Sequence, residues 1–166
     1  KAMRRRHTIA EYLDKIHYLK QVVPGVEIST DLIVGFPGES DTDFEQTMKV
    51  LEEVRFSQVF PFKYSPRPGT KAADLPDDVP RAAKDERLAR VIALQERINN
   101  EQQQALIGTN QDVLIDEAHP RDIGLMNGRT GGYRAITVSG EGLQIGDLVK
   151  VQVTGFRGHW LEGCCI

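Results

Sequence analysis

The stretch STDLIVGFPGES, residues 29–40, decides how the first half of the chain is interpreted. Its first part, up to Val34, is apolar and typical of a strand. Its second part holds two glycines around a phenylalanine and a proline, and Glu39 follows them. Because glycine has no Cβ, this turn either only reverses the chain or lets a ligand approach the backbone closely. The spacing matches neither the dinucleotide-binding nor the P-loop glycine pattern, so those cofactors are not supported.

The residues around this stretch predict alternating helices and strands. Two capping boxes mark the helix starts, Thr8 with Glu11 and Ser40 with Asp43. Residues 8–65 therefore predict helix, strand, helix, strand, an order typical of parallel strands joined by crossover helices. The first strand is apolar on both faces near its end, which predicts cover on both sides. We expect part of an α/β barrel, since two parallel strands alone do not make a stable sheet.

The rest of the chain changes character twice. A connector leads to a long predicted helix over residues 80–108, in which Pro80 suits the first turn. From residue 109, five short β-like runs alternate with glycine turns, which predicts a small all-β barrel. The expected domains are residues 1–79, a connecting helix over residues 80–108, and the β module over residues 109–166.

Composition limits the class of protein. The net charge is −3, and there is no apolar run of membrane-spanning length and no recognisable signal peptide. The two cysteines, Cys164 and Cys165, are adjacent, which excludes a disulfide framework and the spacing of a metal site. We expect a cytoplasmic protein without a membrane partner. The chain starts at Lys1 without an initiator methionine, so we interpret it as a piece of a longer protein.

Three motifs in this order resemble the methylthiotransferase family of radical S-adenosylmethionine (SAM) enzymes. They are MRRRHT at residues 3–8, STDLIVGFPGES at residues 29–40 and FKYSPRPGT at residues 62–70. The β-rich end is similar to the TRAM module, an OB-like RNA-binding barrel that follows the radical SAM barrel in this family. The resemblance implies a partial TIM-like barrel followed by TRAM. It is strongest to the tRNA-modifying branch, which adds a methylthio group to C2 of N6-isopentenyladenosine beside the anticodon.

The resemblance also implies cofactors. Family members use SAM and two [4Fe–4S] clusters, one of them held by a Cys-x-x-x-Cys-x-x-Cys triplet that this chain does not contain. We therefore expect a C-terminal fragment that binds no cluster, contains no catalytic residue and no metal ligand, and is inactive alone. The residues expected to contact SAM lie in the first two motifs: Arg5, Asp31, Ile33, Gly35, Phe36 and Gly38. Glu39 is a weaker candidate, because it sits one place later than the family pattern.

Substrate contacts are expected from the third motif and from the β module. Tyr64 and Arg67 follow the second strand, and arginine there favours an RNA phosphate. Residues 109–166 carry five cationic and seven acidic side chains, a net charge of −2. RNA binding by this module must therefore depend on local clustering with aromatic residues such as Trp160. The candidates are Arg129, Arg134, Lys150 and Arg157.

Some alternatives stay open. Within the family, the substrate is either this nucleoside, threonylcarbamoyladenosine in tRNA, or a ribosomal protein. If the chain does not belong to this family, the alternative is a non-catalytic RNA-binding protein. We also expect self-association through exposed strand edges of the incomplete sheet.

Overall fold

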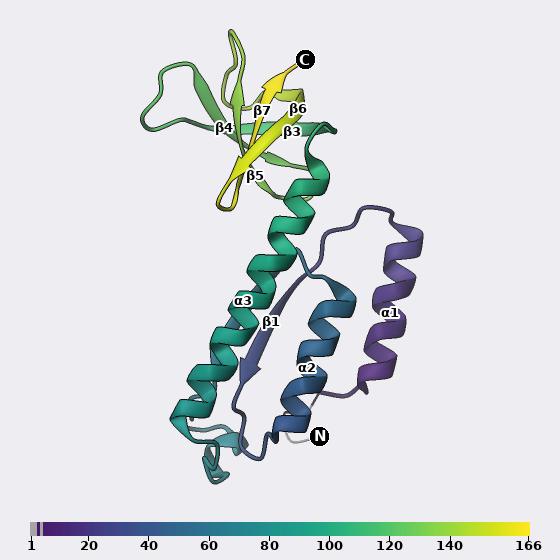
Figure 1. Cartoon of the computed structure of the whole chain (residues 1–166), viewed down its shortest axis with the longest axis vertical. Helices are drawn as coiled ribbons and strands as arrows, with labels where there is room; N and C mark the ends of the chain where they lie inside the picture. Colours follow the sequence, from purple (N-terminus) through teal and green to yellow (C-terminus); the bar gives the residue numbers. More distant parts are fainter. Residues whose placement is uncertain (1–2, 4) are drawn as a thin grey trace. The chain divides into compact units, whose positions relative to one another are not determined.

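The computed structural model describes residue 3 and residues 5–166, and Arg5 is therefore the first candidate residue in it. The chain divides into two compact units between Ile98 and Asn99, so the long helix α3, Arg81–Leu106, contributes to both (Figure 1). Each unit is described by itself.

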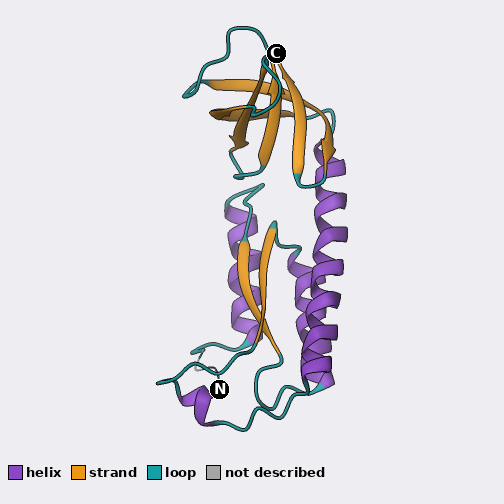
Figure 2. Ribbon diagram, turned by 90° about the vertical axis from the view of Figure 1, so that its left-hand side faces the viewer, coloured by secondary structure: helices purple, strands orange, loops and turns teal. Residues whose placement is uncertain are grey.

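The first unit contains the predicted helix–strand alternation. Its elements in chain order are α1 Ile9–Val22, β1 Ser29–Val34, α2 Asp41–Val54, β2 Gln58–Lys63, the short 3-10 helix η1 Lys71–Asp74, and most of α3. β1 and β2 pair in parallel and run side by side, as expected for strands joined by a crossover helix (Figure 2). Opposite pairs include Asp31 with Phe60 and Ile33 with Phe62.

Both predicted capping boxes are present. Thr8 and Glu11 bond reciprocally at the start of α1, and Ser40 and Asp43 do so at the start of α2. Each box satisfies backbone N–H groups that have no partner within the first turn of a helix. The sequence therefore places the start of α2 immediately after the GFPGE loop.

The core of the first unit lies on one face of the β1–β2 pair. Val34 and Val59 are buried there, against α2 and α3. The other face carries Asp31, Ile33, Phe60 and Phe62, all of which are exposed. The expectation of cover on both faces is therefore not met by the part of the chain that the structure describes, because the residues that pack on the pair gather on one face.

The second unit is a closed barrel with strand order β3-β4-β5-β7-β6, which confirms the predicted all-β barrel. The strands are β3 Asn110–Ala118, β4 Leu125–Thr130, β5 Ala135–Ser139, β6 Leu148–Arg157 and β7 Trp160–Cys165. All five coincide with β-like runs in the sequence. The core is made of alternating inward side chains, Val113, Ile115, Ile136, Val138, Val151, Val153 and Leu161. Gly163 on β7 lets β6 approach closely, since a Cβ there would lie 2.5 Å from Cγ1 of Val151.

Among the described helices, none is long and apolar enough to cross a membrane.

Candidate functional site

The GFPGE loop follows β1 and is closed by its own glutamate. Gly35 has a φ of +71°, and its N–H donates to Oε2 of Glu39 at 2.6 Å. Gly38 has a φ of +81°, and its N–H donates to Oδ1 of Asp78 at 2.7 Å. Both conformations favour glycine. The N–H groups of the two glycines are thus bonded within the chain and are not offered to a ligand.

Glu39 also anchors the loop to α3 through Arg87. The guanidinium of Arg87 donates to Oε2 of Glu39 at 2.7 Å and to Oδ1 of Asp41 at 2.7 Å. Arg87 is buried, with a side chain 7% exposed, and Glu39 is 12% exposed. Burial disfavours the charge of Arg87, but the bonds to Asp41 and Glu39 outweigh it and raise the pKa of Arg87. Arg87 therefore stays charged and fixes the loop.

Lys84, one turn earlier on α3, fills the space beside Gly35. A Cβ on Gly35 would lie 2.4 Å from Cγ of Lys84. The Lys84 ammonium pairs with Asp77 and lies 5.4 Å from the ring centroid of Tyr64. The space left by the missing Cβ of Gly35 is therefore filled by Lys84 of the same chain. The sequence had suggested either a plain turn or a closely approaching ligand at this place.

Four of the candidate residues meet around this loop. The ring of Phe36 packs edge-on against Tyr64 at 5.2 Å, and the Tyr64 N–H donates to the carbonyl of Val34 at 2.8 Å. The Tyr64 hydroxyl donates to the carbonyl of Ala72 at 2.8 Å. Tyr64 is thus held in place, and it joins the GFPGE loop to the third motif. Gly35 and Gly38 complete this group.

The other candidates of the first unit lie apart from that group. Asp31 and Ile33 project from the exposed face of the strand pair, beside Phe60 and Phe62. Arg67 is exposed in the loop after β2, and its carbonyl accepts a hydrogen bond from the Thr70 hydroxyl at 2.8 Å. Arg5 is exposed before α1.

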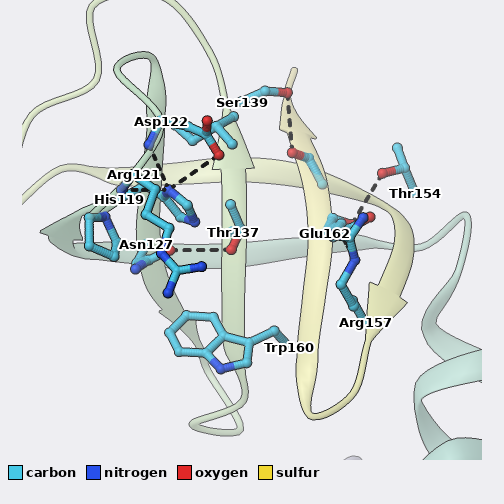
Figure 3. A pocket seen from close by; sticks show the side chains of 13 residues that line it. His119, Arg121, Asp122, Asn127, Thr137, Ser139, Thr154, Arg157, Trp160 and Glu162 are labelled. Atoms are coloured by element: carbon cyan, nitrogen blue, oxygen red, sulfur yellow. Dashed lines mark hydrogen bonds and ion pairs between the residues drawn. The ribbon is translucent and has the colours of Figure 1, made fainter.

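The barrel carries a separate pocket of about 760 Å³ on the face made by β4, β5, β7 and the end of β6. It is lined mostly by polar side chains, together with the indole of Trp160 (Figure 3) and the apolar Pro120 and Leu125. Its polar and aromatic lining includes His119, Arg121, Asp122, Asn127, Thr137, Arg157, Trp160 and Glu162. Of the four cations expected to bind RNA in this unit, Arg157 alone lines the pocket.

The remaining three barrel cations are spread over other positions. Arg129 lies over the rings of Tyr133 and Trp160, at 5.1 and 5.9 Å from their centroids. The guanidinium of Arg134 donates to Oε1 of Gln102 at 2.8 Å. Lys150 forms an exposed ion pair with Asp112 at 2.8 Å. The local clustering of cations with aromatic residues that the sequence predicted is therefore found around Trp160, where Arg129 lies over the ring and Arg157 is its partner in the strand register.

No group of three or more potential metal ligands occurs among the described residues, and Cys164 and Cys165 are free thiols on β7. The donor set present here does not fit an iron–sulfur cluster.

The comparisons with known proteins agree with both units. Residues 1–51 match the radical SAM superfamily, and residues 104–164 match the TRAM domain. A radical SAM segment followed by TRAM is the arrangement that the three sequence motifs and the β-rich end predicted. The superfamily implies SAM and iron–sulfur chemistry.

Curated relatives carry the name tRNA-2-methylthio-N(6)-dimethylallyladenosine synthase. The chain is 47% identical to one from Actinobacillus pleuropneumoniae serotype 5b over 97% of its length and 34% of the relative. It is 46% identical to one from Acidithiobacillus ferrooxidans, over 97% of the chain and 36% of the relative. It is 44% identical to one from Nitrosomonas eutropha, over 98% of the chain and 37% of the relative. The chain is similar to these relatives over nearly its whole length and spans about a third of theirs.

Sequence reasoning missed Lys84, Arg87 and Asn127. The two cations lie on the buried face of α3, in register with Val91 and Leu94, where an apolar stripe is expected. A charged residue at a position of the helix where the pattern calls for an apolar one was the signal that could have identified Lys84 and Arg87. Asn127 had no signal, because its burial depends on the pairing of β4 with β5.

Proposed function

We propose that this chain is the C-terminal part of a tRNA methylthiotransferase that acts on N6-isopentenyladenosine beside the anticodon. The observation that carries the proposal is the union of a radical SAM segment and a TRAM domain in one chain. The names of relatives 44–47% identical over nearly the whole chain support the substrate.

SAM would supply the methyl group and the radical in this reaction. On this chain, the side chains of Ile33 and Asp31 and the ring of Phe36 are the surfaces available to it. Gly35 and Gly38 have their N–H groups bonded to Glu39 and Asp78, so they act by shaping the loop. The ligands for the two proposed [4Fe–4S] clusters would come from the part of the relatives' length that this chain does not span.

Arg5 would pair with a carboxylate, such as that of the methionine part of SAM. Its exposed position leaves the guanidinium accessible. In the complete enzyme, Arg5→Ala is expected to weaken SAM binding, measured by calorimetry. An unchanged affinity would remove this role and leave the rest of the proposal standing.

The tRNA would meet exposed cations on both units. Arg67 stands beside Tyr64 in the loop after β2, and a phosphate is the group that an exposed guanidinium binds best. On the barrel, the candidate cations are the exposed Lys150 and Arg157 and the half-buried Arg129 and Arg134. Because the net charge of the barrel is negative, binding would depend on these local positions and would weaken as salt rises.

The decisive experiment is nucleoside analysis. The complete gene containing this sequence is expressed in a strain that lacks the corresponding synthase, and its tRNA nucleosides are separated by mass spectrometry. We expect the 2-methylthio derivative of isopentenyladenosine to appear. A methylthio group on threonylcarbamoyladenosine, or on a ribosomal protein, would assign the chain to another branch. No methylthio product would favour a non-catalytic RNA-binding protein.

Self-association remains part of the proposal. In the first unit, the described sheet holds only β1 and β2, so each strand has one edge without a paired neighbour there. Such edges favour pairing with another chain. Light scattering of the 166-residue chain is expected to show mass rising with concentration, and a constant monomer mass would remove this element.

A further inference from the structure

We propose that the barrel pocket is a nucleobase subsite, in which the ring of Trp160 stacks on one unpaired base and the Asn127 amide donates to a carbonyl oxygen of that base. The inference rests on the proposed function for its ligand, RNA. It adds a specific contact to a surface that would otherwise hold only phosphates.

The charges of the pocket balance, which argues against a phosphate-binding groove. Nε of Arg157 lies 3.6 Å from Oε1 of Glu162. Elsewhere in the pocket, Oδ2 of Asp122 lies 3.6 Å from Nδ1 of His119. Arg121 and Asp122 contribute one charge of each sign. Sequence-independent phosphate contacts need an excess of positive charge. A pocket of balanced charge suits a neutral ligand with hydrogen-bonding edges.

Trp160 supplies a stacking surface at this pocket. It begins β7, lines the pocket and is 37% exposed, so part of its ring is accessible to a ligand. Arg129 does not line the pocket and lies over the indole at 5.9 Å, so it supports the ring from outside. Unpaired bases in RNA complexes stack on aromatic rings of this kind.

Asn127 supplies the hydrogen-bond donors. It is 5% exposed on β4, opposite Thr137 on β5. The Thr137 hydroxyl donates to Oδ1 of Asn127 at 3.2 Å, and Figure 3 shows this bond at the pocket. The amide Nδ2 then has two N–H groups without a protein partner among the residues that the structure describes.

These donors select the class of base. Uracil, cytosine and guanine carry a ring carbonyl that accepts from an amide N–H. Adenine has no carbonyl and accepts only at its ring nitrogens. Reading adenine with an asparagine also requires the amide oxygen, which Thr137 already engages. The volume of about 760 Å³ is within the range of small-molecule sites and leaves room for one nucleotide. We therefore expect uridine to be bound in preference to adenosine.

The experiment uses the 166-residue chain and short labelled RNAs, octauridylate and octaadenylate. Affinity is measured by fluorescence anisotropy at about 50 mM salt, where the electrostatic term is strong. Trp160 is the single tryptophan of the sequence, so its emission reports stacking directly. We expect octauridylate to quench this emission and to bind at least about fivefold more tightly than octaadenylate.

Four variants separate the contacts. Trp160→Ala should weaken octauridylate binding by about tenfold, whereas Trp160→Phe, which keeps an aromatic ring, should stay within about threefold. Thr137→Val frees Oδ1 of Asn127, so the preference for uridine over adenosine should shrink toward one. Lys150→Ala, outside the pocket, should weaken both RNAs equally. Circular dichroism confirms that each variant is folded.

The outcomes distinguish the subsite from the proposed function. Octauridylate binding without quenching, and unchanged by Trp160→Ala, would overturn the subsite while RNA binding stands. Binding of unfractionated tRNA without any binding of octauridylate would overturn it in the same way. If neither RNA binds, the subsite is overturned as well, and the nucleoside analysis alone then decides the enzymatic proposal.

Discussion

The side chain of Lys84 occupies the space beside Gly35: a Cβ added to Gly35 would lie only 2.4 Å from Cγ of Lys84. The glycine of the loop after β1 is therefore required twice, by its φ of +71° and by the helix that packs against it. This contact connects the chain's most conspicuous sequence feature to a residue 49 positions later, on α3.

Gly35→Ala should strongly destabilise the first unit. Alanine is strained at a positive φ, and its Cβ would clash with the side chain of Lys84. Together these two effects should lower the free energy of unfolding by about 2–4 kcal/mol. Gly38→Ala is the matched control, since its φ is +81° but nothing lies within 4 Å of the added Cβ. It should cost about 1–2 kcal/mol, measured by urea unfolding. If both variants lose the same free energy of unfolding, the Lys84 side chain moves away from the added Cβ without cost.

Arg87→Ala should be costly because it leaves the carboxylate of Glu39 largely buried without its partner. Removing one member of a buried ion pair costs about 3–5 kcal/mol. Arg97→Ala on the same helix is the comparison, since Arg97 and Glu52 form a pair that is 51% and 59% exposed. That change should cost at most about 1 kcal/mol. A loss for Arg87 no larger than that for Arg97 would contradict the anchoring role.

The capping boxes predict loss of helix stability in acid. Hydrogen bonds from Ser40 lower the pKa of Asp43 below that of an ordinary aspartate, and bonds from Thr8 lower the pKa of Glu11 below that of an ordinary glutamate. A lowered pKa in the folded state contributes stability that is fully present above the unfolded pKa and is lost as pH falls through the folded one.

The test compares unfolding between neutral pH and pH values below those pKa values. The wild-type chain should lose stability over this range, and Asp43→Asn should lose less. Ser40→Ala removes the hydroxyl bond to Asp43 but keeps the bond from the backbone N–H of residue 40, so it should weaken the pH dependence less than Asp43→Asn does. If Asp43→Asn keeps the full wild-type pH dependence, the capping box does not carry it.

Gly163→Ala should disrupt the barrel. The added Cβ would lie 2.5 Å from Cγ1 of Val151 and 2.7 Å from the backbone oxygen of Gln152, and neither group can move without displacing β6. Overpacking of this kind costs about 1–3 kcal/mol. Gly155→Ala, on β6 with no atom closer than 3.8 Å, should be tolerated. Thermal unfolding that ranks the two variants in the opposite order would refute this view of the barrel packing.

Local patterns predicted most of the elements because each depends on neighbours in the chain. Ser40 and Asp43 marked the start of α2, and the alternating runs after residue 109 gave all five barrel strands. The candidate site was less predictable. Gly35 and Glu39 were singled out, but nothing near them in the sequence indicated that Lys84 and Arg87 would contact them, because these two cations reach the loop only when α3 packs against the strand pair.

The sequence by itself determined the order of helices and strands, the parallel pairing, the barrel and the resemblance to a family. These follow from periodicity, caps, turn residues and three short motifs, all of which act over a few residues. The tertiary structure alone decided that Arg87 locks the GFPGE loop, that one strand face of the first unit is exposed, and that Asn127 and Trp160 share a pocket. Those relationships depend on segments distant in sequence, and burial and hydrogen bonding between them are fixed only by packing.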